Sequence, residues 1–442
     1  MVRHSDSEMV IPDRGALGWV QSLFAQGNSI LAALRNERLS PEKVLDLQNR
    51  KLRAMVNHAY HNTIFYRRKF ERAGLTADDI QTVDDLPKLP PTTKQELRIA
   101  KVEEILARGY TPENTIIEPT SGSSGIVLRV YHAQDAFDRY FAYAFRPLWE
   151  MGYRPWYRVA YTALEPVAPL PWEKLGLGVR RQIDLRSGDP RKYVEALLDL
   201  HPQMLLGFPS IFMLIVRSAN PEELAQIRPK AILLNSELLT DTTRQIIGEA
   251  FQCECYDDYS TIEFHQVAFE CRHHRSHLAA DNVIVEVTQE GQPVPAGEKG
   301  EILITGLTNH AMPLLRYGIG DIGTISPERC PCGRGFPVMK LVEGRIDDYI
   351  TLPSGRKLSP RLVNPTIEFL PGVREHVVVQ ESPDEFSVYV NIAPEYADAT
   401  AADVVSGLEQ LFQEPVHIRL IHTTEFERGR TGKLRCVISK VK

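Results

Sequence analysis

Long apolar runs, cysteine and excess positive charge are all scarce in this sequence, and each shortage narrows what the chain can be. No apolar stretch approaches the roughly 20 residues of a membrane-spanning helix, and the start, Met1 to Asp6, lacks the apolar core of a secretory leader. Six cysteines in 442 residues are too few for a disulfide scaffold, so reduced thiols and a cytoplasmic location are expected. The net charge of −6 argues against nucleic acid as a main partner.

The composition is that of a globular protein large enough for two or three domains, with 43% hydrophobic and 24% charged residues. Between about 115 and 305, short apolar runs alternate with helical patterns, which is typical of layered α/β architecture. The pattern changes near Gly344. We therefore predict an α/β fold with a large layered N-terminal domain, 1–345, that includes a helical lead-in at about 14–110. A small α+β C-terminal domain, 346–442, is expected to follow it as a mobile cap.

Periodicity and flanking residues predict the individual elements. Apolar runs predict strands at 159–162, 203–207, 231–234, 375–380 and 386–392. Helical patterns predict helices near 133–151, 190–200, 209–219, 240–251 and 401–412. Ser40 is expected to cap a helix that begins at Pro41.

A glycine and hydroxyl run lies between two predicted strands. It reads Thr120-Ser121-Gly122-Ser123-Ser124-Gly125. Glycine permits the positive φ angles with which a loop turns its backbone amides toward one point, and the hydroxyls add further hydrogen-bond donors. Phosphate is therefore the expected ligand of this loop. The run is not a Walker loop, because it lacks the lysine and no helical pattern follows. The plain alternative is a hairpin loop of ordinary turn residues.

Four more stretches follow in order. They are Tyr259-Ser260-Thr261-Ile262-Glu263, Arg316-Tyr317-Gly318-Ile319-Gly320-Asp321, Gly344-Arg345-Ile346-Asp347-Asp348 and Arg430-Thr431-Gly432-Lys433. Each alone has a structural explanation: Asp321 could cap a turn, Glu263 could begin a helix and Lys433 could be a solvated charge. Together with the glycine run, they resemble the motifs of the adenylate-forming acyl-CoA synthetase superfamily, most closely its phenylacetate–CoA ligase-like branch, over about residues 40–442.

The resemblance implies a role for each motif. Thr120 to Gly125 would cradle the ATP phosphates, Tyr259 would flank the adenine, and Asp321 would hold the ribose hydroxyls. Three residues are expected to act in catalysis. Glu263 would bind Mg²⁺, Arg345 would contact the nucleotide, and Lys433 would reach the acyl–phosphate bond. Other residues expected around the nucleotide and the acid are Ser236, Glu237, Asp258 and Ser260, with Phe208 and Tyr131 as further candidates for the acid pocket.

The implied activity is ATP- and Mg²⁺-dependent activation of a carboxylic acid, with aromatic acids among the options, and transfer of the acyl group to CoA. A lysine, Mg²⁺ and backbone donors together neutralise charge as a carboxylate attacks the α-phosphate. The loop at 353–360 departs from the family pattern, so an amine or another nucleophile is an alternative acceptor. A second alternative is a catalytically inactive protein that binds a nucleotide and serves as a scaffold. The expected partner is a small-molecule acid, with no nucleic acid or membrane; the resemblance is compatible with a homodimer.

Cysteines and histidines also indicate a structural zinc site. Thiolates with imidazole in a four-ligand set suit Zn²⁺, and the expected ligands are Cys271, His277, Cys330 and Cys332. His273 or His274 could replace His277. Some members of the resembled branch carry a similar arrangement, whereas the alternative is a group of free cysteines near a loop.

Overall fold

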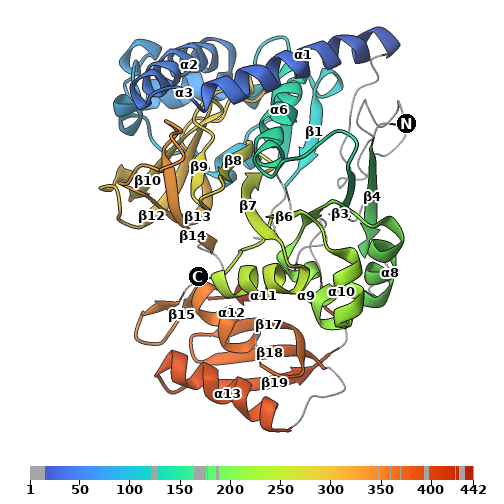
Figure 1. The fold of residues 1–442 in the computed structure, drawn as a ribbon. Helices are drawn as coiled ribbons and strands as arrows, with labels where there is room; N and C mark the ends of the chain where they lie inside the picture. The colour runs from blue at the N-terminus through green and yellow to red at the C-terminus, as the bar shows by residue number, and fades with distance from the viewer. Residues whose placement is uncertain are drawn as a thin grey trace, which may run out of the picture.

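The structure, a computed structural model, describes residues 15–120, 128–163, 176, 178–185, 189–345, 349–358, 360–368, 370–392, 398–423, 425–427 and 434–441. A twelve-stranded sheet with helices around it occupies most of the chain, and a separate four-stranded sheet with its own helices lies at the C-terminal end (Figure 1). The predicted α/β class, with a smaller C-terminal sheet domain, is confirmed. Among the described residues, no helix is both long and apolar enough to cross a bilayer.

Two long and three shorter α-helices make up the N-terminal part of the described chain. They are α1 (Gly15–Asn36), α2 (Pro41–Asn62), α3 (Ile64–Arg72), α4 (Lys94–Ile99) and α5 (Val102–Ile105), with 3₁₀ turns η1 (Ala77–Asp79), η2 (Val83–Lys88) and η3 (Pro112–Asn114). The Ser40 side chain accepts a hydrogen bond from the Lys43 amide, which confirms the predicted cap of α2. The buried face of α2 packs against Ile284 and Leu315, so the lead-in helices cover the antiparallel part of the large sheet.

Parallel strands form one end of the large sheet. They are β3 (Arg158–Ala163), β4 (Val179–Asp184), β5 (Met204–Gly207), β6 (Ala231–Asn235) and β7 (Glu254–Thr261). The helices between and beside them are α6 (Gln134–Glu150), α8 (Pro190–Leu200), α9 (Pro209–Ser218), α10 (Pro221–Ile227) and α11 (Asp241–Phe251). Their core includes Leu205, Ile232, Phe212 and Phe251, all fully buried, because strands covered by helices bury their side chains.

Antiparallel strands extend this sheet on the other side of β7. They are β8 (His265–Glu270), β9 (Ser276–Leu278), β10 (Val283–Gln289), β11 (Gln292–Pro293), β12 (Gly300–Gly306), β13 (Tyr317–Ile325) and β14 (Val338–Arg345). The full order is β11-β10-β12-β13-β14-β9-β8-β7-β6-β5-β3-β4. A separate hairpin pairs β1 (Ile116–Pro119) with β2 (Arg129–His132). The glycine-rich run Gly318–Gly323 lies within β13, so it is part of a strand and not a dinucleotide loop.

The C-terminal part has its own sheet and core. Its elements are β15 (Ile350–Thr351), β16 (Lys357–Leu358), α12 (Pro360–Glu368), β17 (Val373–Ser382), β18 (Glu385–Ile392), α13 (Asp398–Phe412), β19 (His417–His422) and β20 (Val437–Ser439). It contacts the helices of the larger part: the Arg217 guanidinium on α9 donates to the backbone carbonyls of Glu368 and Arg374. The hydroxyl of Thr243 on α11 donates to Glu368 Oε1 at 3.3 Å.

Most predicted elements are confirmed. The predicted helices correspond to α6, α8, α9, α11 and α13, and the predicted strands to β3, β5, β6, β17 and β18. Helix α10 and the individual strands β8–β12 were not predicted, since short segments give weak periodic signals. The domain boundary at residue 345 stays a prediction; β14 ends there.

Candidate active site

The base of the predicted phosphate loop is visible in the β1–β2 hairpin. The Thr120 amide donates to the Leu128 carbonyl at 2.8 Å, and the Thr120 hydroxyl accepts from the Leu128 amide at 3.0 Å. Thr120 therefore closes the loop that follows it. Ser121, Gly122, Ser123, Ser124 and Gly125 lie outside the described residues, as do Lys433 and the side chain of Arg345.

Tyr259 and Asp321, from two different motifs, lie in direct contact. The Tyr259 hydroxyl donates to Asp321 Oδ2 at 2.5 Å, although the residues are 62 positions apart. Tyr259 lies on β7 and Asp321 on β13, so the bond joins the parallel and antiparallel parts of the sheet. A hydrogen bond to a carboxylate is short and strong, which holds the ring and the acid in fixed positions. The Tyr259 hydroxyl thereby orients the carboxylate of Asp321.

Glu263 is similarly held by a tyrosine of the other motif. It lies between β7 and β8, is 7% exposed, and its Oε1 accepts a hydrogen bond from the Tyr317 hydroxyl at 3.1 Å. Glu263 does not begin a helix, because β8 starts at His265. A buried carboxylate with a single neutral donor retains lone pairs for a hard cation such as Mg²⁺.

Asp258 and Ser260 lie on either side of Tyr259 along β7. Gln266 Nε2 donates to Asp258 Oδ1 at 3.0 Å, and Ser260 pairs with Gln266 in the β7–β8 ladder. Burial raises the pKa of Asp258 to about 6, although the hydrogen bonds from Gln266 and Ser260 oppose that shift. Asp258 is thus a buried acid whose protonation changes near neutral pH.

Glu237 lies in the loop after β6, where it joins two parts of the chain. Its carboxylate accepts hydrogen bonds from the Ser210 amide and hydroxyl, both at 2.9 Å, at the start of α9. It also accepts from the Leu434 amide at 3.4 Å, and Leu434 belongs to the C-terminal part of the chain. Ser236 has a φ of 70°, in the left-handed region, as a sharp turn after a strand requires.

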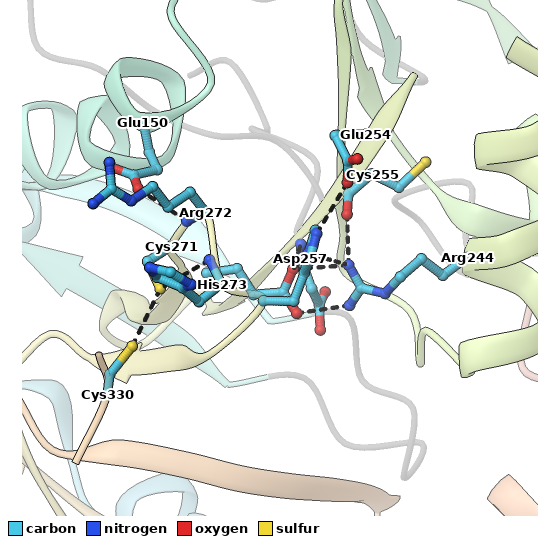
Figure 2. Close-up of polar contacts among 11 residues, drawn as sticks. Glu150, Arg244, Glu254, Cys255, Asp257, Cys271, Arg272, His273 and Cys330 are labelled. Carbon is cyan, nitrogen blue, oxygen red and sulfur yellow. Dashed lines mark hydrogen bonds and ion pairs between the residues drawn. The ribbon is translucent and has the colours of Figure 1, made fainter. Parts of the chain in front are cut away.

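Strands β7 and β8 are tied to α11 by an ion pair. The Arg244 guanidinium on α11 donates to both carboxylate oxygens of Glu270 at 2.6 and 2.8 Å and to the Cys255 carbonyl at 2.5 Å. Glu270 Oε2 in turn accepts from the Asp257 amide at 2.9 Å. Figure 2 shows Arg244 reaching the strand from its helix. This two-point contact is geometrically specific and positions the strand that carries Tyr259.

The expected zinc ligands meet in one place. Cys271, His277, Cys330 and Cys332 have ligand atoms that all lie within 4.8 Å of one another. The sulfurs of Cys271 and Cys330 are 3.6 Å apart, and Cys332 Sγ is 3.2 Å from His277 Nε2. A dashed line joins the first two sulfurs in Figure 2. Ligands on a tetrahedral Zn²⁺ with bonds of about 2.0–2.3 Å lie at such separations.

The structure also distinguishes the three histidines near this cluster. His277 is fully buried, and its Nδ1 lies 3.2 Å from the Phe336 carbonyl, which leaves Nε2 directed to the cysteines. Burial lowers the pKa of His277 to about 4, so its ring is neutral. The His274 ring instead contacts Glu254 and Glu270. His273 is absent from the cluster as well.

The two aromatic candidates for the acid pocket are not brought together. Phe208 is 6% exposed and packs in the core between the parallel strands and their helices. Tyr131 is 3% exposed and packs in a different core, with Leu128 and Phe264. Sequence reasoning missed Tyr317 as the partner of Glu263; its place beside Arg316 in the motif was the available signal. It also missed Glu118, His132 and His265, which form a cluster at the base of the β1–β2 hairpin.

Similarity to known proteins agrees with this arrangement. The chain is 28% identical over 398 residues to a phenylacetate–coenzyme A ligase of Thermus thermophilus, covering 84% of this chain and 86% of the relative. It is 26% identical to a phenylacetate–coenzyme A ligase of Escherichia coli, covering 75% and 78% of the two chains. No family model matches.

Solved structures show the same fold. A 2-hydroxyisobutyryl-CoA ligase in the postadenylation state with 2-HIB-AMP matches with a TM-score of 0.76 at 21% identity, over 92% of this chain and 91% of that one. The same ligase with 2-HIB-AMP and CoA in the thioesterification state matches with a TM-score of 0.63 over 92% of each chain. The motifs, their contacts, the fold and the curated relatives all support the adenylate-forming superfamily and, within it, the phenylacetate–CoA ligase-like branch.

Proposed function

We propose that this protein activates a carboxylic acid with ATP, forming an acyl-adenylate and pyrophosphate, and then transfers the acyl group to CoA. The observation that carries the proposal is the pairing of motifs: Tyr259 with Asp321 at 2.5 Å, beside Glu263 with Tyr317 at 3.1 Å. Packing within the sheet does not by itself require two tyrosine–carboxylate pairs between the segment at 259–263 and the segment at 317–321. The ligase activity of the relatives named above supports the same reaction.

Each side chain has a distinct task in this reaction. Asp321 accepts from the ribose hydroxyls, while Tyr259 flanks the adenine. Glu263 would hold Mg²⁺, and that ion would supply positive charge beside the phosphates of ATP. The loop from Thr120 to Gly125 supplies amide donors to the departing pyrophosphate. Arg345 contacts the nucleotide, and Lys433 stabilises charge at the acyl–phosphate bond.

Transfer to CoA calls for a second arrangement of the C-terminal domain, residues 346–442. We place the pivot at Asp347, so that rotation removes Lys433 and admits the thiol. The higher TM-score to the postadenylation structure supports an adenylation-type arrangement here. The cytoplasm, which contains ATP and CoA, is the proposed compartment. Aromatic acids are the first substrates to test, because two curated relatives are phenylacetate–CoA ligases.

A structural Zn²⁺ at Cys271, His277, Cys330 and Cys332 completes the proposal. Three thiolates and one imidazole form a closed four-ligand set, which is the usual composition of a structural site. The ion would join β8 and β9 to the segment before β14. It would stabilise the fold and take no part in the reaction.

The experiment is acid-dependent ATP–pyrophosphate exchange across aromatic and aliphatic acids, each with and without CoA. Exchange with one class of acid, and a CoA thioester detected by mass spectrometry, is the expected result. Exchange without thioester would favour an amine or another nucleophile as the acceptor. ATP binding by calorimetry without exchange for any acid would point to a silent nucleotide-binding scaffold.

A further inference from the structure

A second cluster of metal-binding side chains lies apart from the cysteine site. Glu118 is on β1, His132 ends β2 and His265 begins β8. Glu118 Oε2 is 2.8 Å from His265 Nε2 and 3.2 Å from His132 Nε2, and the three ligand atoms all lie within 4.8 Å of one another. Segments that are more than 100 residues apart in sequence thus place two imidazoles around one carboxylate.

Two of these side chains are buried and the third is partly exposed to solvent. Glu118 is 5% exposed and His132 is not exposed at all. The His265 side chain is 26% exposed, so the cluster has one side open toward solvent. Tyr140 stacks on the His265 ring with centroids 4.4 Å apart and an interplanar angle of 21°, which fixes the orientation of that imidazole.

Hydrogen bonding alone does not account for His132. Neither of its ring nitrogens makes a well-aligned hydrogen bond within the described part of the chain, although both are buried and both the Glu118 carboxylate and the Ile262 backbone lie beside the ring. Its Nε2 is close to Glu118 Oε2 but is not aligned to donate to it. His265, in contrast, hydrogen-bonds to the same oxygen. A buried nitrogen without a partner is costly, so an additional group that satisfies it is expected.

A shared cation explains this geometry. Donor atoms that bind one ion with bonds of about 2.0–2.2 Å lie about 3 Å apart, and they need not be aligned for a hydrogen bond to one another, as His132 and Glu118 are not. The separations of 2.8 and 3.2 Å fit that pattern. Imidazole nitrogens select transition ions, whereas Mg²⁺ and Ca²⁺ prefer oxygen ligands only.

We propose that Glu118, His132 and His265 bind a divalent first-row transition ion, distinct from both the Mg²⁺ at Glu263 and the zinc at the cysteines. Three protein ligands leave at least one coordination position open, on the exposed side of His265, where water completes the set. The ion joins β1, which ends directly before Thr120, to β8, which begins two residues after Glu263. It therefore stabilises the positions of β1 and β8, which lie next to the residues of the proposed nucleotide site.

Metal binding to the full-length protein tests this proposal. Bound metal is removed from the protein with a chelator, and Co²⁺ is then added back. Equilibrium dialysis measures the amount of Co²⁺ that binds, and absorption spectroscopy identifies its ligands. Co²⁺ at the cysteine site gives sulfur-to-metal charge-transfer bands, whereas Co²⁺ at the histidine–carboxylate site gives only d–d bands, so the two sites are separable in one sample. Wild type is expected to show a sulfur-free class of bound Co²⁺.

The variants are Glu118→Gln, which keeps the shape of the side chain, and His265→Gln, at the partly exposed position. Each is expected to lose the sulfur-free Co²⁺ and to keep the charge-transfer bands. His61→Gln, at an exposed position on α2, is the matched control and should bind as wild type does. Thermal melts monitor folding; if Glu118→Gln fails to fold, His265→Gln decides alone. Retention of the sulfur-free Co²⁺ in folded His265→Gln, or its absence from wild type, would overturn the proposal and leave a polar network in which Glu118 accepts from histidine.

Discussion

The backbone amide of Leu434 lies 3.4 Å from Glu237 Oε1 and donates to it, which joins the C-terminal part of the chain to the loop after β6. Glu237 is held on its other side by Ser210 at the start of α9. This contact places Leu434, which directly follows Lys433 in the sequence, near the carboxyl end of β6. Ligand sites of open α/β sheets lie at such ends.

Replacing Lys433 tests the adenylation step. Lys433→Ala should lower the rate of acid-dependent pyrophosphate exchange by roughly 100-fold or more, the effect of removing one charge-stabilising donor from a transition state. ATP binding by calorimetry should change little, since the lysine acts on the acyl–phosphate bond. Lys440→Ala, an exposed lysine paired with Glu381, is the control and should retain activity. Normal exchange by Lys433→Ala would remove the residue from the mechanism.

The Tyr259–Asp321 pair should act as a unit in nucleotide binding. Tyr259→Phe and Asp321→Asn are each expected to raise the KM for ATP, and the double variant should cost less than the sum of the two. The coupling should be about 1–3 kcal/mol, the range for hydrogen bonds to charged groups. Steady-state kinetics measures it. Tyr256→Phe, on the same strand, is the control, and strictly additive effects would show that the 2.5 Å bond does not matter for ATP.

The cysteine cluster should stabilise the fold through zinc. Cys332→Ser is expected to lower the zinc content and the melting temperature, because it opens a closed four-ligand site. A chelator should lower the melting temperature of wild type but not that of Cys332→Ser. Cys253→Ser serves as the control, since Cys253 packs at the edge of the core and lies outside the cluster. Equal zinc content in all three proteins would contradict the site.

Asp258 should make stability depend on pH. Its folded pKa of about 6 lies above its usual value of 3.8, so the native state holds the proton more tightly. Its contribution is therefore fully present below about pH 4 and is lost as the pH rises through about 6. Asp258→Asn should gain stability relative to wild type over that window, by about 3 kcal/mol at about 1.4 kcal/mol per pKa unit. Urea unfolding from mildly acidic to neutral pH measures this, with exposed Asp78→Asn as the control; a difference that does not vary with pH would refute it.

The sequence by itself determined the local elements and the order of the motifs. Ser40 before Pro41 specified the start of α2, because capping depends on neighbours within one turn. The sequence pattern likewise predicted α8 and β6. Helix α8 buries one face, and strand β6 is a short run of buried apolar residues. Residue type and spacing also singled out Cys271, Cys330 and Cys332, with one of three histidines, as a candidate cluster for zinc.

Only the tertiary structure decided which distant residues meet. The strand order places β14, β9 and β8 between β13 and β7, and yet Tyr259 reaches Asp321; no local pattern encodes that contact. The choice of His277 over His274 likewise depended on Glu254 and Glu270, which hold the His274 ring. The cluster of Glu118, His132 and His265 gave no motif at all. Its members are assembled by sheet and hairpin packing, in which separation along the chain carries no information about separation in space.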